Sequence, residues 1–346
     1  MAEKLRLKES TYILKESEDV YQVIFTSTRV VRRFKVDQLV KDVISGLKEE
    51  HQRARLTERL SSKYDLPDVE SCLASLEKFG VLVKQNTELP LNPRYERQVA
   101  FIAELTNSWE EAISLQSKLE GSTISIFGVG GIGTWMVNGF YQIGIGHLRI
   151  ADPDVIHESN LNRQLFFTSK DIGKYKVDVV ADKLPDANLQ TSKKKVSEEV
   201  NLEEIISGSD FLVNCADSPS VADTTRIISR YAKKFGIPYM VTGGYNMHLG
   251  MVGPIIIPGK TACFDCFLES QKIRDSISKL EVIKDIEQTG SLGPIAGVVS
   301  NFQVMDVFKF LVEKGSVNLN RFAEIDFMNL SIDWREFKKR EGCDCC

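Results

Sequence analysis

The stretch Gly128-Val129-Gly130-Gly131-Ile132-Gly133 decides the fold expected for this chain. It follows the short apolar run 124–127, which is typical of a buried strand, and precedes 134–143, where a helix is expected. Glycines between a strand and a helix let the backbone approach a phosphate, and the helix N-terminus attracts its negative charge. Asp152 ends the next apolar run, 148–151, and lies 152 − 133 = 19 residues beyond the last glycine, a spacing typical of a carboxylate that binds ribose hydroxyls. The pattern predicts a doubly wound, mostly parallel α/β sheet that binds a nucleotide.

The bulk composition is that of an ordinary globular protein with more than one part. The chain has 346 residues, of which 42% are hydrophobic and 27% charged, and its formal net charge is −4. That length exceeds one typical core, so we expect a small unit over 1–90 and a larger nucleotide-binding unit over 91–346. The N-terminus alternates charged and apolar residues, unlike a secretory signal, and no apolar run suggests a membrane span. We therefore expect a cytoplasmic protein with no membrane or nucleic-acid partner.

The front unit, 1–90, is expected to be winged-helix-like. Two β-rich runs flank Thr26-Ser27-Thr28 and suggest a hairpin, and apolar residues then recur at helical spacing. Pro67 suits a first helical turn, and Gly80 suits a helix end. The expected elements are a hairpin of 21–25 and 30–34, helices over 39–47, near 56–60 and over 67–79, and a wing strand at Val81-Leu82-Val83.

The choice of nucleotide depends on charged residues after the glycine stretch. A glycine fingerprint with Asp152 fits a nicotinamide dehydrogenase as well as an ATP enzyme. Cleaving ATP at its α-phosphate needs positive charge, which Arg163 and Lys176 could supply, and Asp217 follows a strand where a carboxylate could hold Mg²⁺. Each of these residues taken alone could be a solvated loop charge.

Taken together, the motifs of the second unit resemble those of the E1-like adenylating family, which includes the activating enzymes of ubiquitin-like proteins and of bacterial sulfur carriers. The resemblance covers about residues 91 to 346 and implies a Rossmann-like domain that forms acyl adenylates from ATP. The matching motifs are Arg94-Tyr95-Glu96-Arg97-Gln98, Gly128 to Gly133, Asp152-x-Asp154, Ser159-Asn160-Leu161-x-Arg163-Gln164, Gly173-x-x-Lys176, Cys215-Ala216-Asp217, and Gly290 to Gly297 followed by Gln303, Asp306 and Lys309.

The resemblance also implies roles for individual residues. Asp152 would bind the ribose, and Asp217 would bind Mg²⁺. Arg97 would reach the ATP of a neighbouring subunit, which implies a homodimer with composite sites. The phosphate contacts would come from Asn160, Arg163 and Lys176, the other nucleotide-binding positions would be Gly128, Gly130, Gly131, Gly133, Asp154 and Gln164, and the catalytic candidates are Arg97, Arg163, Lys176 and Asp217.

Five of the seven cysteines gather in two places, at Cys263 and Cys266 and in the tail at Cys343, Cys345 and Cys346. Cys263/Cys266 and Cys343/Cys346 each have the Cys-x-x-Cys gap, and four thiolates suit a closed tetrahedral Zn²⁺ site, which is structural and not catalytic. Cys345 could replace a neighbour as ligand or be a free thiol, but neither alternative keeps the two-residue gap. The family resemblance implies the same structural zinc.

The family members that pass the acyl group to a thiol carry a cysteine after the first zinc pair, and 267–299 contains none here. Cys215 lies at the end of a predicted strand and is interpreted as a small buried side chain. A thioester relay is therefore not expected. The adenylate should instead be attacked by a nucleophile on the substrate itself or by water.

The front unit indicates what the substrate is. Residues 1–90 hold 16 Lys+Arg against 15 Asp+Glu, counted from the sequence, which is no footprint for DNA. An exposed hairpin edge can take up a peptide as an added strand, with Arg29, Arg32, Arg33 and Lys35 nearby to pair with acidic side chains. The order of the two units resembles the peptide-modifying enzymes of microcin C and pantocin A biosynthesis. That resemblance implies adenylation of a carboxylate on a leader-bound precursor peptide, followed by ring closure with net dehydration.

Three alternatives stay open at this point. The front unit could be a packing or dimerisation domain. The enzyme could adenylate a sulfur carrier that ends in Gly-Gly. The chain could also be a non-catalytic leader-binding scaffold with a degenerate nucleotide site, although the presence of Asp152, Arg163, Lys176 and Asp217 argues against degeneracy.

Overall fold

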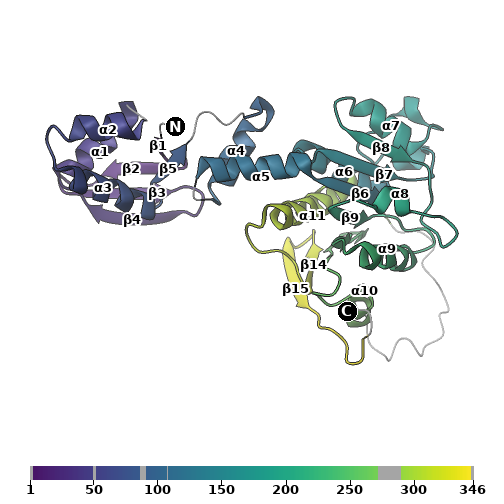
Figure 1. Cartoon of the computed structure of the whole chain (residues 1–346). Coiled ribbons are helices and arrows are strands. Elements are labelled where there is room, and N and C mark those ends of the chain that lie inside the picture. The colour runs from purple at the N-terminus through teal and green to yellow at the C-terminus, as the bar shows by residue number, and fades with distance from the viewer. Residues whose placement is uncertain (1–2, 50–51, 86–90, 107, 272–289, 344–346) are drawn as a thin grey trace. The chain divides into compact units, whose positions relative to one another are not determined.

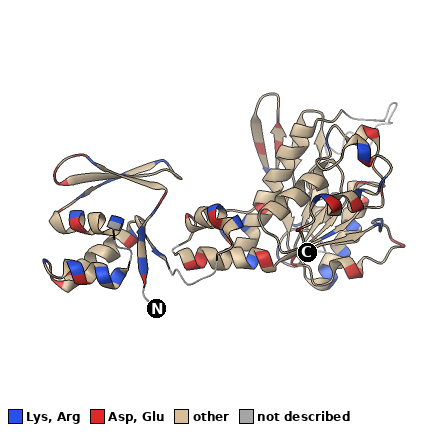
Figure 2. Ribbon diagram, turned by 90° about the horizontal axis from the view of Figure 1, so that it is seen from above, with Lys and Arg blue, Asp and Glu red and all other residues tan. Residues whose placement is uncertain are grey.

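The computed structural model describes residues 3–49, 52–85, 91–106, 108–271 and 290–343. The chain forms two compact units, Met1–Ser117 and Lys118–Cys346 (Figure 1). The helix α5, Trp109–Gly121, carries the chain from one unit into the other. Figure 2 shows Lys and Arg as well as Asp and Glu on the helices of each unit.

The first unit packs three helices against two small antiparallel sheets. The helices α1 (Gln38–Glu49), α2 (Arg53–Leu60) and α3 (Leu66–Lys78) enclose a core that includes Leu5, Val43, Leu56 and Leu73. The predicted hairpin and the three predicted helices are thus found. The strands are β2 (Thr11–Lys15), β3 (Val20–Phe25) and β4 (Val30–Lys35), in the order β2-β3-β4, with β1 (Lys4–Leu7) paired to β5 (Leu82–Gln85).

The strand predicted as the wing, Val81-Leu82-Val83, corresponds to β5 and does not join the hairpin sheet. It pairs antiparallel with β1, and Leu7 lies opposite Leu82. The alternation Lys4-Leu5-Arg6-Leu7 is a period-two strand pattern that places Leu5 in the core. The winged-helix comparison stays a prediction. The segment that follows holds a 3₁₀ turn at Pro93–Tyr95 and α4 at Glu96–Ala103.

The second unit is built on the predicted parallel sheet. The strands run in the order β13-β10-β9-β6-β7-β8, and all neighbours are parallel except β13, which pairs antiparallel with β10. From β6 the chain moves outward to β7 and β8 and then returns to β9 on the other side of β6. This reversal creates a crevice at the carboxyl ends of β6 and β9, where ligands bind in such folds. The bounds are β6 Thr123–Phe127, β7 His147–Ala151, β8 Leu189–Ser192, β9 Phe211–Asn214, β10 Tyr239–Val241 and β13 Ile255–Ile256.

Helices cover this sheet, and a second sheet lies beside α11 (Gly293–Val312) (Figure 1). The second sheet has the order β11-β12-β14-β15 and is antiparallel. The remaining helices are α6 Gly131–Gln142, α7 Lys176–Lys183, α8 Glu203–Ile206, α9 Val221–Phe235 and α10 Phe264–Gln271, with 3₁₀ turns η2 Glu158–Asn160 and η3 Ser169–Asp171. The second sheet consists of β11 Tyr245–Asn246, β12 Leu249–Val252, β14 Arg321–Asp326 and β15 Ser331–Glu336.

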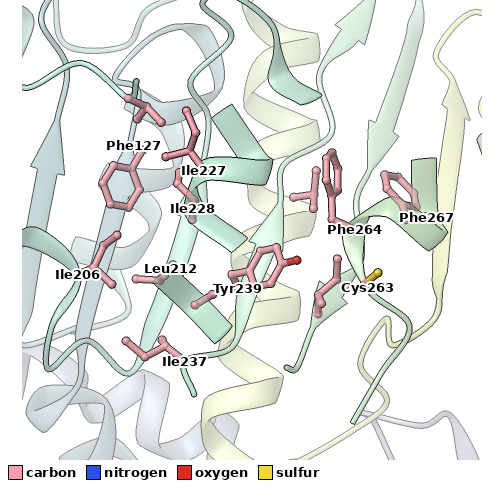
Figure 3. Packing of buried hydrophobic residues seen from close by; sticks show 14 of the residues in the cluster. Phe127, Ile206, Leu212, Ile227, Ile228, Ile237, Tyr239, Cys263, Phe264 and Phe267 are labelled. Atoms are coloured by element: carbon pink, nitrogen blue, oxygen red, sulfur yellow. The ribbon is translucent and has the colours of Figure 1, made fainter. Parts of the chain in front are cut away.

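The core of the second unit ties the cysteine segment to the sheet. Figure 3 shows Phe127, Leu212, Tyr239, Phe264 and Cys263 in one cluster of buried side chains. Apolar side chains from β6, β9, α9 and α10 therefore share one core, and the burial of their apolar surface favours this arrangement.

The helix α11 corrects one expectation from the sequence. It is long and apolar enough to cross a membrane by length and composition, although no such run was expected. Its most apolar window is 67% buried inside the protein, and Asp306 within it is almost fully buried. A core helix of a soluble protein passes the same test, so α11 is weak evidence for a membrane span.

Candidate functional site

Two of the glycines are required by close backbone packing. Gly128 has φ +90°, and a Cβ added there would lie 2.7 Å from the backbone of Cys215 and Ala216. A Cβ on Gly133 would lie 2.0 Å from the Gly128 carbonyl oxygen. Gly130 is different, because a Cβ there would meet nothing within 4 Å. The backbone packs too closely for a side chain at Gly128 and Gly133, whereas Gly130, at the start of α6, has open space beside it.

Asp152 is held against the glycine turn by its own backbone partners. Its carboxylate accepts hydrogen bonds from Val129 N at 2.6 Å and Asp154 N at 2.8 Å. Burial raises the pKa of Asp152 above its usual value, and the opposing effects of Lys176 and of these two amides are smaller. A buried carboxylate fixed in this way has an exact position relative to the turn, which is what a ribose-binding group requires.

Lys176 begins α7 and is the buried cation of the site. Its Nζ lies 2.7 Å from Asp154 Oδ2 and 4.0 Å from Asp152 Oδ1, and the residue is 6% exposed. Lys174, two residues earlier, instead pairs with Asp171 at 3.0 Å and is exposed. Lys176 lines the cavity described below and Lys174 does not, and the role of Lys176 as a phosphate contact stays a prediction.

The segment around η2 places a second cation, Arg163, at the start of α6. Asn160 is buried, and its Oδ1 accepts a hydrogen bond from His157 N at 3.0 Å, which closes the turn. Arg163 Nη1 donates to Ser159 O at 2.6 Å, and its methylene groups lie 3.4 Å from the point where a Cβ on Gly131 would be. Asn160 thus shapes the turn that places Arg163 over Gly131.

These residues line one cavity of about 590 Å³ at the carboxyl ends of the parallel strands. Its wall joins positions that lie far apart in the sequence. Asp217 lines it from the segment after β9, whereas Gly133 is absent from its wall because it packs under Gly128. The expected site residues in the wall are Gly128, Gly130, Gly131, Asp152, Asp154, Asn160, Arg163, Gln164, Lys176 and Asp217. Arg97 lies on α4 in the first unit.

Two further parts of this wall were not expected from the sequence. Lys194 and Lys195 follow β8, and the segment Thr242 to Tyr245 follows β10. Both segments come directly after parallel strands, so their position was in principle detectable once those strands had been assigned. The expectation did not include them because neither strand was recognised.

Three of the four expected zinc ligands lie together. The sulfurs of Cys263 and Cys266 are 3.7 Å apart, and those of Cys263 and Cys343 are 3.6 Å apart. Sulfurs on a tetrahedral zinc with bonds of about 2.3 Å would be separated by about 3.8 Å, so this donor set fits the ion. Cys345 and Cys346 lie outside the described residues, and the fourth ligand stays a prediction.

Cys215 lines the cavity and is half-buried, so it is not the fully buried side chain expected from the sequence. Burial raises the pKa of its thiol to about 12. Its sulfur lies 3.8 Å from Met136 Sδ. Because the thiolate is the nucleophile, a thiol protonated at neutral pH is a poor one.

A comparison with protein families decides the affiliation of the chain. Residues 95–345 match the model of the ThiF family. The chain belongs to the ThiF family. ThiF-family proteins are adenylating enzymes, and the wall of polar and charged groups around the cavity fits ATP as their cosubstrate.

Two curated relatives each match about two thirds or more of the chain. The sulfur carrier protein ThiS adenylyltransferase of Escherichia coli is 26% identical over 263 residues, which is 73% of this chain and 94% of the relative. The SAMP-activating enzyme E1 of Haloferax volcanii is 25% identical over 235 residues, 67% of this chain and 82% of the relative.

Solved structures resemble the whole chain. Escherichia coli MccB, solved with MccA-N7isoASN, superposes with a TM-score of 0.76 at 21% identity, covering 99% of both chains. PaaA gives a TM-score of 0.71 at 24% identity, covering 96% of this chain and all of PaaA. At these identities the likeness shows that the fold is shared.

Proposed function

We propose that this ThiF-family enzyme adenylates a carboxylate on a ribosomally made precursor peptide, which then closes a ring by intramolecular attack. The proposal depends on a difference in coverage between the family match and the structural similarity to MccB and PaaA. The family match begins at residue 95, whereas the likeness to MccB and PaaA includes the front unit as well. MccB has been solved with MccA-N7isoASN and with N-formylated MccA. Because the front unit is part of the similarity to MccB, which was solved with MccA, it supports a peptide substrate for this enzyme.

The cavity supports the adenylation step. Asp152 would hold the ribose, and the start of α6 would receive the phosphates. Lys176 and Arg163 would balance the negative charge that accumulates on pyrophosphate as it leaves. Asp217 would hold Mg²⁺ through a carboxylate oxygen. An intramolecular nucleophile on the peptide then avoids the entropic cost of a second binding event.

The leader segment of the peptide would add a strand to β4 in the front unit. Among the described residues β4 pairs with β3 alone, so its outer edge is open. Val30 and Val31 on this strand are 43% and 53% exposed. An exposed edge with apolar side chains is the type of surface to which a peptide strand adds.

The basic residues near β4 differ in how they are held. Arg33 is engaged by Glu16, with Nε 2.8 Å from its carboxylate, whereas the Arg32 guanidinium lies 5.4 Å from the ring centres of both Phe25 and Phe79. Stacking leaves the edge of a guanidinium free to donate hydrogen bonds. Arg32 is therefore better placed than Arg33 to pair with an acidic leader residue.

The decisive experiment is ATP–pyrophosphate exchange with the precursor peptide encoded beside the gene. We expect exchange that depends on the peptide and is lost in Asp217→Ala. Removing the leader from the peptide should lower the rate at limiting peptide concentration. Exchange that is supported equally well by a small free acid would refute the proposal.

Leader binding itself is measured by fluorescence anisotropy with labelled leader. Arg32→Glu should weaken binding by at least about tenfold, because it removes one ionic contact and adds a repulsive charge. Lys48→Glu is the matched control, since Lys48 is an exposed cation on α1 of the same unit. Equal loss in the two variants would show a general charge effect and not a peptide site at β4.

A homodimer with Arg97 contributed in trans is part of the proposal. Arg97→Ala and Asp217→Ala variants should each be inactive alone. Mixed and re-equilibrated in equal amounts, they should recover about one quarter of the active sites, because half of the dimers are mixed and each holds one intact site. No recovery would indicate that Arg97 does not act across a subunit interface, and an active Arg97→Ala variant would indicate that Arg97 has no role in the reaction.

The second candidate is adenylation of a sulfur carrier, which the named curated relatives favour. It predicts exchange that depends on a small protein ending in Gly-Gly. The two candidates separate in a single experiment, because the precursor peptide and such a carrier protein can be offered to the same enzyme preparation.

A further inference from the structure

Tyr245 is held in the wall of the nucleotide cavity by a well-anchored segment. The preceding residues are fixed from several sides: the Thr242 hydroxyl donates to Asn214 O, and Gly243 N donates to the fully buried Gln303 Oε1 at 2.8 Å. Met251 N donates to Gly244 O at 2.9 Å, and Tyr245 itself pairs with Gly250 in the β11–β12 ladder. A side chain on such a backbone is preorganised, and its position costs little to maintain when a ligand binds.

The Tyr245 hydroxyl lies at the start of α6. Its oxygen is 3.2 Å from the point where a Cβ on Gly131 would be, and the Arg163 methylene groups lie 3.4 Å from the same point. The residue is half-buried and lines the cavity. Within the described part of the chain its hydroxyl makes no hydrogen bond. A phenol donor without a partner thus lies next to the N-terminus of a 12-residue helix, where anions are favoured.

The order of the strands indicates which anion this donor meets. Asp152 follows β7, the glycine turn follows β6, and Tyr245 comes from the far side, after β10. The Asp152 carboxylate touches the turn directly through Val129 N, so a ribose held there places its own 5′ phosphate at the start of α6. The α-phosphate is therefore the group that reaches Gly131 first.

We infer that the Tyr245 hydroxyl donates a hydrogen bond to a non-bridging oxygen of the ATP α-phosphate and so positions the phosphorus for attack. The inference rests on the ATP-dependent adenylation proposed above. In that step a bond forms between a carboxylate oxygen and the α-phosphorus, the bond to the bridging oxygen breaks, and pyrophosphate leaves with the electron pair. The tyrosine keeps its proton throughout and acts as a positioning donor for the charge on the α-phosphate.

The test compares the two diastereomers of ATPαS, in which sulfur replaces one or the other non-bridging α-oxygen. Calorimetry with Mg²⁺ should show that the unaltered protein binds one diastereomer about 3- to 10-fold more weakly than the other, the range expected for one lost hydrogen bond. In Tyr245→Phe this ratio should change by about the same 3- to 10-fold, which is the contribution of the tyrosine hydroxyl. Mg²⁺ has its own preference between the two diastereomers. Because Mg²⁺ is present in every measurement, this preference cancels when the ratio in Tyr245→Phe is compared with the ratio in the unaltered protein. Peptide-dependent exchange should fall about 100-fold in turnover, as for loss of one preorganised donor, while the KM for ATP should rise by no more than the about 3- to 10-fold expected for the lost hydrogen bond.

Two further variants make the result specific. Tyr231→Phe removes a hydroxyl outside the cavity, one that accepts a hydrogen bond from Leu202 N at 3.3 Å, and should leave the ratio unchanged. Gly131→Ala keeps the tyrosine but places a methyl group 3.2 Å from its hydroxyl oxygen, and should reduce the ratio independently. A ratio in Tyr245→Phe equal to that of the unaltered protein would overturn the inference. Failure of the unaltered protein to bind ATP would overturn the adenylation proposal and the inference with it.

Discussion

Gly133→Ala tests whether the glycine turn is required by packing or by ligand binding. The added Cβ would lie 2.0 Å from the Gly128 carbonyl oxygen, and ordinary contact begins at 3.4 Å, so strand and helix must separate by about 3.4 − 2.0 = 1.4 Å. The obstacle is backbone on both sides and cannot rotate away. The movement would also strain the first turn of α6, where Thr134 N donates to Gly130 O at 3.1 Å.

Overpacking of this kind costs about 3 kcal/mol, out of a total stability of about 5–15 kcal/mol. For a domain of this size, about 3 kcal/mol corresponds to a fall in Tm of roughly 6–12 °C. We expect this fall in thermal unfolding of the ligand-free protein, followed by tryptophan fluorescence. ATP is absent from the measurement, so any change reports packing alone.

Gly130→Ala is the matched control. It makes the same chemical change three residues earlier, where a Cβ meets nothing within 4 Å and φ is −90°. Its Tm should stay within about 2 °C of the unaltered protein, because an added methyl that meets no obstacle costs little. Its methyl group projects into the cavity, so its affinity for ATP should fall instead. Equal melting temperatures for the two variants would refute the assignment of Gly133 to packing and Gly130 to the ligand.

Three other outcomes are expected. Cys263→Ser should lower bound zinc, measured by mass spectrometry, from about one equivalent to none, and of the two tail variants Cys346→Ser should do the same while Cys345→Ser should not. Cys215→Ala should keep peptide-dependent exchange within about threefold, since burial holds the pKa of its thiol near 12 and no thioester is expected; loss of turnover with intact ATP binding would contradict this. Burial raises the pKa of Asp152 above 3.8, so its contribution to stability is fully present below pH 3.8 and is lost as the pH rises through the folded-state pKa. Asp152→Asn should flatten this part of the pH dependence in urea unfolding, and a curve that kept the same slope would contradict the assignment.

Most of the nucleotide site could be predicted from local sequence. The apolar run before Gly128, the spacing to Asp152, the Gly173-x-x-Lys176 motif and the position of Asp217 just after a strand are short-range signals, and ten of the expected residues line the cavity. Such signals are reliable because strand, turn and helix N-terminus are each specified within a few residues. The proximity of Cys263, Cys266 and Cys343 was also expected, since a two-residue gap lets both sulfurs of a pair face one ion.

Local sequence patterns therefore specify the nature of each helix, strand and turn and the chemistry that it carries. Only the tertiary structure decided which edges and surfaces meet. It paired Leu82 with Leu7 and kept β5 out of the hairpin sheet, and it brought the Tyr245 hydroxyl over Gly131 from a strand end more than a hundred positions away. Contacts of this kind depend on the summed packing of whole elements and on the order of strands in the sheet. No short stretch of sequence contains that information, because the interactions that select it form only when the chain has folded.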